Sequence, residues 1–108
     1  MVSVDFFKDN MGFQAMDLNG HANYNPGQDI VCAGISALAF ALVGTLRNVR
    51  DISFRRCTVV NGVQVEIEPF IEPEDRAITD TVFKTILVGL RQIEKKYPDH
   101  IEIKEIVL

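Results

Sequence analysis

Two side chains with known reaction chemistry lie close together in the stretch GHANYNPGQDIVCAGIS, residues 20–36. His21 follows a glycine at the head of a turn-rich loop, and Cys32 lies just inside an uncharged apolar run that begins at Ile30. A cysteine thiolate attacks carbonyl carbon, and an imidazole accepts the thiol proton and later returns one to a leaving amine. The pair is therefore a candidate for thiol-dependent hydrolysis of a peptide bond.

The start of the apolar run offers a way to activate the thiol. Asp29 is a good N-cap residue, which would place Cys32 in the first helical turn. Unpaired backbone N–H groups and the positive end of the helix dipole favour a thiolate there and could stabilise an oxyanion, although the charge of Asp29 partly offsets this. Ser36 lies on the same helix face, where it could bond to the site or back to the carbonyl of Cys32. Gly20 leaves room for a substrate backbone.

Simpler explanations exist for each of these residues. A cysteine at a helix start is usually a small buried hydrophobic residue, and a loop histidine is usually solvated. We expect Cys57 to have no role. A metal site made from both cysteines, His21 and His100 fits no known ligand spacing, so we expect no metal and no cofactor. The residue types alone leave a catalytic pair and an unrelated histidine and thiol as open alternatives.

Hydrophobic periodicity predicts seven elements that would position these residues. Val2, Val4 and Phe6 alternate along a first strand, and helix 73–97 carries an apolar stripe of Ile78, Val82, Ile86, Leu90, Ile93 and Tyr97. The expected elements are strand 2–7, turn 8–12, strand 13–19, loop 21–28, helix 30–48, a hairpin within 54–69, helix 73–97 and a final strand within 100–108. The order β-β-α-β-β-α-β predicts one α+β domain over residues 1–108, with a mostly antiparallel sheet packed against two helices.

The hairpin within residues 54–69 has the strongest local signal. Asn61-Gly62 between two apolar runs favours a two-residue type I′ turn. This turn would pair Thr58 with Val65 and place Cys57 on the outward face with Glu66. Val63, Val65 and Ile67 would then face the core.

Helix 30–48 is apolar on all sides, which one sheet cannot cover. We therefore predict a homodimer with this helix near the interface. The uncharged run from Ile30 to Leu46 is near the lower length limit of a membrane span, but we interpret it as a buried helix and expect no membrane partner.

Composition and charge indicate the class of partner and the cellular compartment. The 108 residues include 47% apolar and 24% charged residues, with a net charge of −4 and a pI of about 5.0. Direct nucleic-acid binding is disfavoured because it needs basic patches, whereas a basic peptide partner suits the acidic balance. Two cysteines are too few for a disulfide framework, and Lys8 is the one basic residue among the first forty, so we expect a cytoplasmic protein.

The motifs GHA at 20–22 and DIVCAGIS at 29–36, joined by a short loop, resemble the ribosomal-processing cysteine protease family. Chain length, element order, the Asn-Gly hairpin and the long second helix fit as well, so the resemblance covers nearly the whole chain. It implies a small, cytoplasmic, homodimeric bacterial protease, a hydrolase that takes part in ribosome biogenesis. Such enzymes remove a short N-terminal extension from a large-subunit ribosomal protein, with aromatic residues before the cut bond and basic residues after it.

The resemblance also assigns roles. It implies that His21 is the general base and Cys32 the nucleophile, and that Asp29 and Ser36 match the other polar site positions. Gly20 matches a glycine that lets the following loop move. The loop 22–28 would act as a flap on the substrate. Its expected substrate contacts are Ala22, Tyr24 and Gly27.

An apolar groove is expected to hold the aromatic side chains of the substrate. Its expected lining is Phe7, Phe13, Tyr24 and residues of the first helix.

Two other functions remain open. One is a non-catalytic, dimeric, ribosome-associated binding module, and the other is a different thiol chemistry such as acyl transfer or redox exchange.

Overall fold

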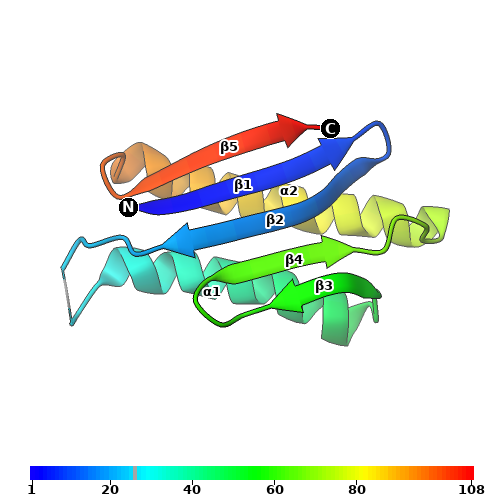
Figure 1. Cartoon of the computed structure of the whole chain (residues 1–108), viewed down its shortest axis with the longest axis horizontal. Helices are drawn as coiled ribbons and strands as arrows, with labels where there is room; N and C mark the ends of the chain where they lie inside the picture. Colours follow the sequence, from blue (N-terminus) through cyan, green and yellow to red (C-terminus); the bar gives the residue numbers. More distant parts are fainter. Residues whose placement is uncertain (26) are drawn as a thin grey trace.

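The structure is a computed structural model that describes residues 1–25 and 27–108, and it has the predicted order of strands and helices (Figure 1). A π-helical segment, Thr45–Val49, directly continues the first helix. The elements are β1 (Val2–Asp9), β2 (Gly12–Gly20), α1 (Ile30–Gly44), β3 (Phe54–Thr58), β4 (Val63–Ile67), α2 (Pro73–Lys96) and β5 (Ile101–Val107).

All five strands form one sheet in the order β3-β4-β2-β1-β5. Neighbouring strands are antiparallel except β1 and β5, which run parallel. Both helices cover the same face of the sheet, and the other face is left open (Figure 1). The predicted α+β class, with a mostly antiparallel sheet packed against two helices, is confirmed.

The core lies between the sheet and the two helices. Val2, Val4 and Phe6 point into it as their alternation predicts, and all three are fully buried. Phe83 of α2 stacks on Phe13 with ring centroids 5.8 Å apart and contacts Phe6 edge-on at 6.5 Å. These aromatic contacts fix α2 across the middle of β1 and β2.

The buried face of α2 is rotated relative to the prediction. Ile86 and Leu90 of the predicted stripe are buried, but Phe83 and Leu87, which the stripe omits, are buried as well. The predicted members Ile78, Val82, Ile93 and Tyr97 are only half-buried. The reason is that α2 packs against two neighbours. One face meets the sheet, and a second face meets α1, where a Cβ placed on Gly34 would lie 3.5 Å from Ile93.

The predicted register of the β3–β4 hairpin is wrong by one residue. Cys57 pairs with Val65 and Thr58 with Gln64, so the loop is longer than the two-residue turn. Asn61 and Gly62 do adopt positive φ angles of 58° and 117°, as the Asn-Gly signal predicts. A one-residue shift moves every side chain to the opposite face. Cys57 therefore packs half-buried against the core instead of pointing outward with Glu66.

Helix α1 leaves an apolar face uncovered. Val31 and Ile35 point into the core, whereas Ile30 and Phe40 on the other side are 63% and 52% exposed. The helical stretch Ile30–Val49 is long and apolar enough to cross a membrane by length and composition alone. The core helix of a two-layer domain has the same properties, and the buried residues of α1 are Val31, Ile35, Ala39, Leu42 and Val43.

Candidate active site

Cys32 is held at the start of α1 by the cap that the sequence predicts. The Asp29 side chain accepts a hydrogen bond from the Cys32 N–H at 2.9 Å, and its second oxygen accepts one from the Tyr24 N–H at 3.0 Å. The Cys32 N–H first, and then the Tyr24 N–H, hold the pKa of Asp29 below its ordinary value of 3.8, although partial desolvation opposes them. Asp29 therefore carries a negative charge at neutral pH and ties the loop after His21 to the helix start.

This cap changes one expectation from the sequence. The unpaired N–H groups of the first helical turn were candidate donors to an oxyanion, but one of them, the Cys32 N–H, donates to Asp29. It can serve a substrate oxygen only if the Asp29 side chain moves. Cys32 still lies in the first turn of α1, close to the positive end of the helix dipole.

His21 follows directly after β2, whose last residue is Gly20. The His21 side chain is exposed. Gly20 has a φ of 96°, and a Cβ at this position would overlap the carbonyl oxygen of Met1, which directly precedes the neighbouring strand β1. The glycine is therefore required by the pairing of β1 and β2, a role distinct from the predicted one of admitting a substrate backbone.

His21 and Cys32 line the same cleft, which has a volume of about 160 Å³. Two further predicted site residues, Gly20 and Ser36, line it as well. This cleft, called here the His21–Cys32 cleft, opens where the end of β2, the start of α1 and the tip of the β3–β4 hairpin meet. Its other lining residues are mostly apolar: Val2, Leu18, Ile35, Ala39, Phe40, Val59, Gly62 and Val63.

Several residues expected at the site do not line this cleft. Ala22 is only 1% exposed and belongs to the core, and Tyr24 packs against the rings of Tyr97 and His100. Gly27 is exposed, and no described atom lies within 4 Å of a Cβ built on it. The predicted flap 22–28 includes Pro26, which lies outside the described residues.

The aromatic lining of the cleft also differs from expectation. Phe13 is buried beneath α2 and Phe7 is half-buried on β1, and neither borders the His21–Cys32 cleft. Of the expected lining, residues of α1 do border the cleft, Phe40 among them. Val59 and Gly62 at the hairpin tip were missed. Their position depends on strand order, which local sequence does not reveal.

No third residue orients the His21 ring through a hydrogen bond among residues 1–25 and 27–108. Asp29 was the candidate, but its two oxygens are engaged by backbone N–H groups. His100, which the sequence did not indicate for this role, comes nearest to it. Its Nδ1 lies 2.8 Å from the carbonyl oxygen of Ala22, next to His21 in the chain.

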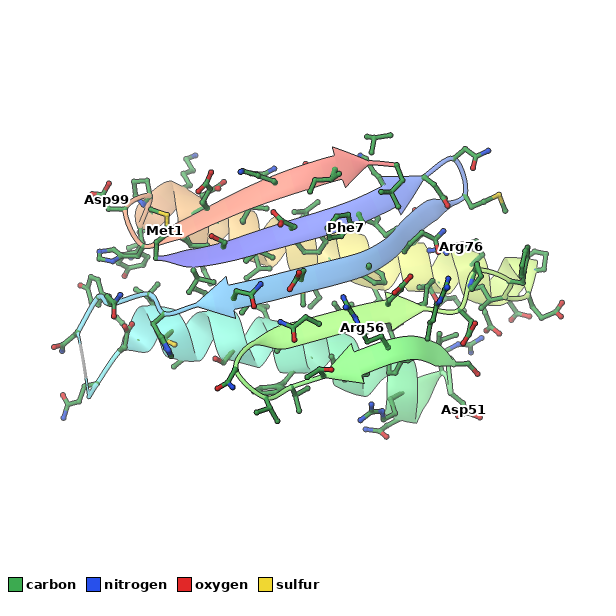
Figure 2. The ribbon with its side chains drawn as sticks, viewed as in Figure 1. Met1, Phe7, Asp51, Arg56, Arg76 and Asp99 are labelled. Carbon is green, nitrogen blue, oxygen red and sulfur yellow. The ribbon has the colours of Figure 1, made fainter. Side chains whose placement is uncertain are left out.

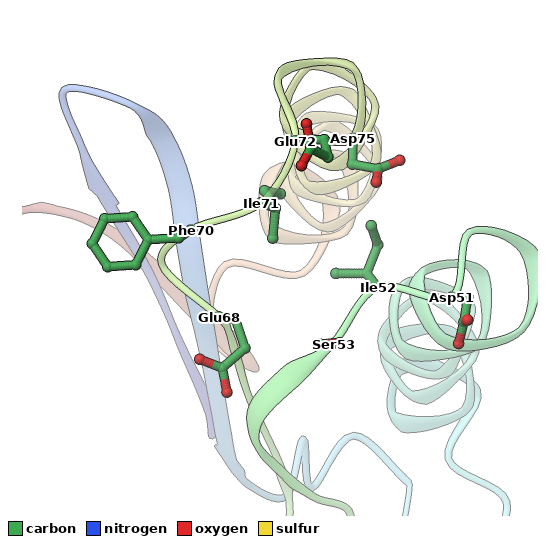
Figure 3. A pocket seen from close by; sticks show the side chains of 8 residues that line it. All are labelled: Asp51, Ile52, Ser53, Glu68, Phe70, Ile71, Glu72 and Asp75. Carbon is green, nitrogen blue, oxygen red and sulfur yellow. The ribbon is translucent and has the colours of Figure 1, made fainter.

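A second cleft, of about 340 Å³, lies at the opposite end of the molecule (Figure 3). Asp51, which borders it, is far from Met1 in Figure 2, whereas Met1 lies against Gly20. Carboxylates of Asp51, Glu68, Glu72 and Asp75 surround it, and Phe70 points away from it. Its lining residues include neither a thiol nor an imidazole, so it offers no cysteine–histidine pair.

Within the described part of the chain, no three His, Cys, Asp or Glu side chains are grouped so that they could hold a metal ion. Both cysteines are free thiols, and both are half-buried.

Sequence and fold both resemble known proteins. Residues 1–102 match the family described as Cysteine protease Prp. The chain is 31% identical over 109 residues to the ribosomal processing cysteine protease Prp of Staphylococcus aureus, covering 95% of this chain and 97% of that protein. It is 27% identical over 95 residues to the protein of the same name from Bacillus subtilis (strain 168), covering 85% of each. The S. aureus protease crystallised with a covalently linked product peptide has the same fold, with a TM-score of 0.80 at 23% identity over 97% of this chain and 99% of that one.

Proposed function

The chain belongs to the Prp family of cysteine proteases, and we propose that it removes the N-terminal extension of a large-subunit ribosomal protein, with Cys32 as nucleophile and His21 as general base. The observation that carries this proposal is the shared cleft. His21 and Cys32 come from different elements and still line one opening. The names of the relatives, which describe ribosomal processing, support the substrate class.

In the proposed reaction, the Cys32 sulfur attacks the carbonyl carbon of the bond to be cut, and its proton passes to His21. A sulfur–carbon bond forms, and the carbon–nitrogen bond breaks as His21 gives the proton to the leaving amine. Water then attacks the thioester carbon and gives a proton to His21. The sulfur–carbon bond breaks, the acid product leaves, and His21 returns the proton to the Cys32 sulfur. The positive end of the α1 dipole attracts the negative charge that develops on the Cys32 sulfur in both steps, and the charge of Asp29 partly offsets this attraction.

The apolar wall of the His21–Cys32 cleft suits the aromatic side of the proposed substrate. Phe40, Val59 and Val63 lie along it, together with the buried Ile35. An aromatic side chain entering this cleft would lose water contact on the same side as the reacting thiol, which favours binding. We assign this wall to the residues that precede the cut bond.

We propose that the protein acts as a cytoplasmic homodimer. Ribosomal proteins are made and assembled in the cytoplasm, and the uncovered apolar face of α1 supports a second copy. Alanines at 33, 37 and 41 are exposed on this face along with Ile30. Sedimentation should give a dimer mass for the wild type, and Ala37→Glu should shift it toward monomer because a charge would be buried against the partner. A monomeric wild type would refute this part of the proposal.

The proteolytic function is tested by incubating a peptide that spans the extended N-terminus with the wild type, Cys32→Ala, His21→Ala and Cys57→Ala, followed by mass spectrometry of the products. Cys57→Ala is the matched control because it removes a half-buried thiol outside the cleft. We expect one cut by the wild type and by Cys57→Ala, and none by the other two. Binding without cutting by the wild type would instead support the ribosome-associated binding module.

A further inference from the structure

His100 links the tight turn between α2 and β5 to the segment that follows His21. Its Nδ1 lies 2.8 Å from the Ala22 carbonyl oxygen, although the two residues are 78 positions apart in the chain. Because a carbonyl oxygen only accepts hydrogen bonds, Nδ1 carries the proton and donates it. The carbonyl that His100 holds therefore belongs to the residue next to the proposed base.

His100 is itself fixed from two sides. Its backbone N–H donates to the Tyr97 carbonyl at 3.0 Å, and its own carbonyl accepts from the Val2 N–H at 2.9 Å. Figure 2 shows the neighbouring Asp99 on the same end of the molecule as Met1, where β1 begins. The imidazole thus extends from a turn that is attached to both α2 and β1, which makes it a stiff support.

Aromatic contacts hold the same segment from the side. The Tyr24 ring meets the His100 ring edge-on with centroids 5.3 Å apart, and it meets the Tyr97 ring in the same way at 5.2 Å. Ala22 is buried between these contacts and the core. The residue after His21 therefore has a defined place, whereas the His21 side chain is exposed.

We propose that His100 is a positioning residue for the protease reaction: by holding the Ala22 carbonyl, it sets where the His21 imidazole lies relative to the Cys32 thiol. This inference depends on the proposed roles of His21 and Cys32. His100 does not border the His21–Cys32 cleft, so it acts through the backbone and not on the substrate. A displacement of about 1 Å in a reacting group can cost roughly 100-fold in rate.

Two substitutions separate positioning from simple support of the fold. His100→Asn keeps an N–H donor the same number of bonds from the backbone as Nδ1, whereas His100→Phe keeps a ring and loses the donor. We expect kcat for cleavage of the extended peptide to fall about 10-fold to 100-fold in His100→Phe, with KM little changed. We expect His100→Asn to recover most of kcat. Asp99→Asn, an exposed neighbour in the same turn, is the control and should cleave like the wild type.

A second measurement does not depend on proteolysis. The rate of Cys32 alkylation by iodoacetamide, measured in a Cys57→Ala background, reports whether His21 assists the thiol. We expect His21→Ala and His100→Phe to slow alkylation, and the double variant to be no slower than His21→Ala alone, since both act on one interaction.

Equal loss of kcat in His100→Asn and His100→Phe, wild-type kcat in His100→Phe, or additive losses in the alkylation cycle would each overturn the inference. If the wild type cuts no peptide, the proposed function fails. The alkylation cycle then still decides whether His100 positions His21.

Discussion

The change Gly20→Ala tests whether the pairing of β1 and β2 dictates the glycine next to His21. Gly20 has a φ of 96°, which an L residue adopts only at a cost of about 1–3 kcal/mol. The new methyl group would also overlap the Met1 carbonyl oxygen, which belongs to backbone and cannot rotate away. Forcing a methyl group into occupied space costs about 1–3 kcal/mol more.

The expected loss in the free energy of unfolding is therefore about 2–6 kcal/mol, a large share of the roughly 5–15 kcal/mol that stabilises a typical domain. Urea unfolding followed by circular dichroism measures it directly. For a chain of this size, a loss of about 2 kcal/mol lowers Tm by roughly 8 °C, which thermal unfolding can detect easily.

Gly27→Ala is the matched control. Gly27 has nearly the same φ, 92°, but no described atom lies within 4 Å of the added Cβ. The free energy of unfolding of Gly27→Ala should fall by no more than the cost of a positive φ, about 1–3 kcal/mol. The difference between the two variants isolates the overlap with Met1. If both variants lose the same free energy of unfolding, the overlap is relieved at no cost and the reasoning is wrong.

Three further predictions follow from the contacts described. Asp29→Ala should destabilise the fold above pH 3.8 and progressively less below it, because the native pKa of Asp29 is lowered and its stabilising hydrogen bonds disappear on protonation. Urea unfolding at neutral and acidic pH measures this loss. A loss of stability that does not depend on pH would contradict the prediction. Iodoacetamide should label Cys32 faster than Cys57, because Cys32 borders an open cleft at a helix start. Peptide mass spectrometry measures the two labelling rates. Faster labelling of Cys57 would contradict the assignment of Cys32 as the reactive thiol. Phe83→Ala should cost about 3–5 kcal/mol in urea unfolding through loss of its contacts with Phe6 and Phe13, and a cost below about 1 kcal/mol would show that the core closes around the gap.

Local signals in the sequence were enough to predict the elements and the cap. The alternation of Val2, Val4 and Phe6 and the cap at Asp29 depend on interactions between residues close in the chain, and both agree with the structure. His21 and Cys32, which one short loop separates, line one cleft, and their role as a pair stays a prediction. Such contacts leave a pattern that can be read in one segment.

Features set by distant residues left no such pattern. The register at Cys57 was wrong because the Asn-Gly signal predicts a turn without fixing its length, and packing of β3 against the core then selects the pairing. The bond between His100 and Ala22 could not be predicted, since nothing near either residue indicates the other. The position of Val59 in the wall of the cleft could not be predicted either, because it depends on β2 and β4 being neighbours in the sheet.

The two proposed catalytic residues are held in different ways, and this difference bears on how the site would adapt to a substrate. Cys32 lies between Val31 and Ile35, which are fully buried, so its backbone moves only with the whole of α1. His21 lies on an exposed segment between Gly20 and the Ala22 carbonyl held by His100. The exposed His21 side chain can change its rotamer while the bond between His100 and Ala22 stays intact, whereas displacing Cys32 would move a buried helix. Adjustment on substrate binding should therefore occur on the His21 side, with the nucleophile as the fixed reference.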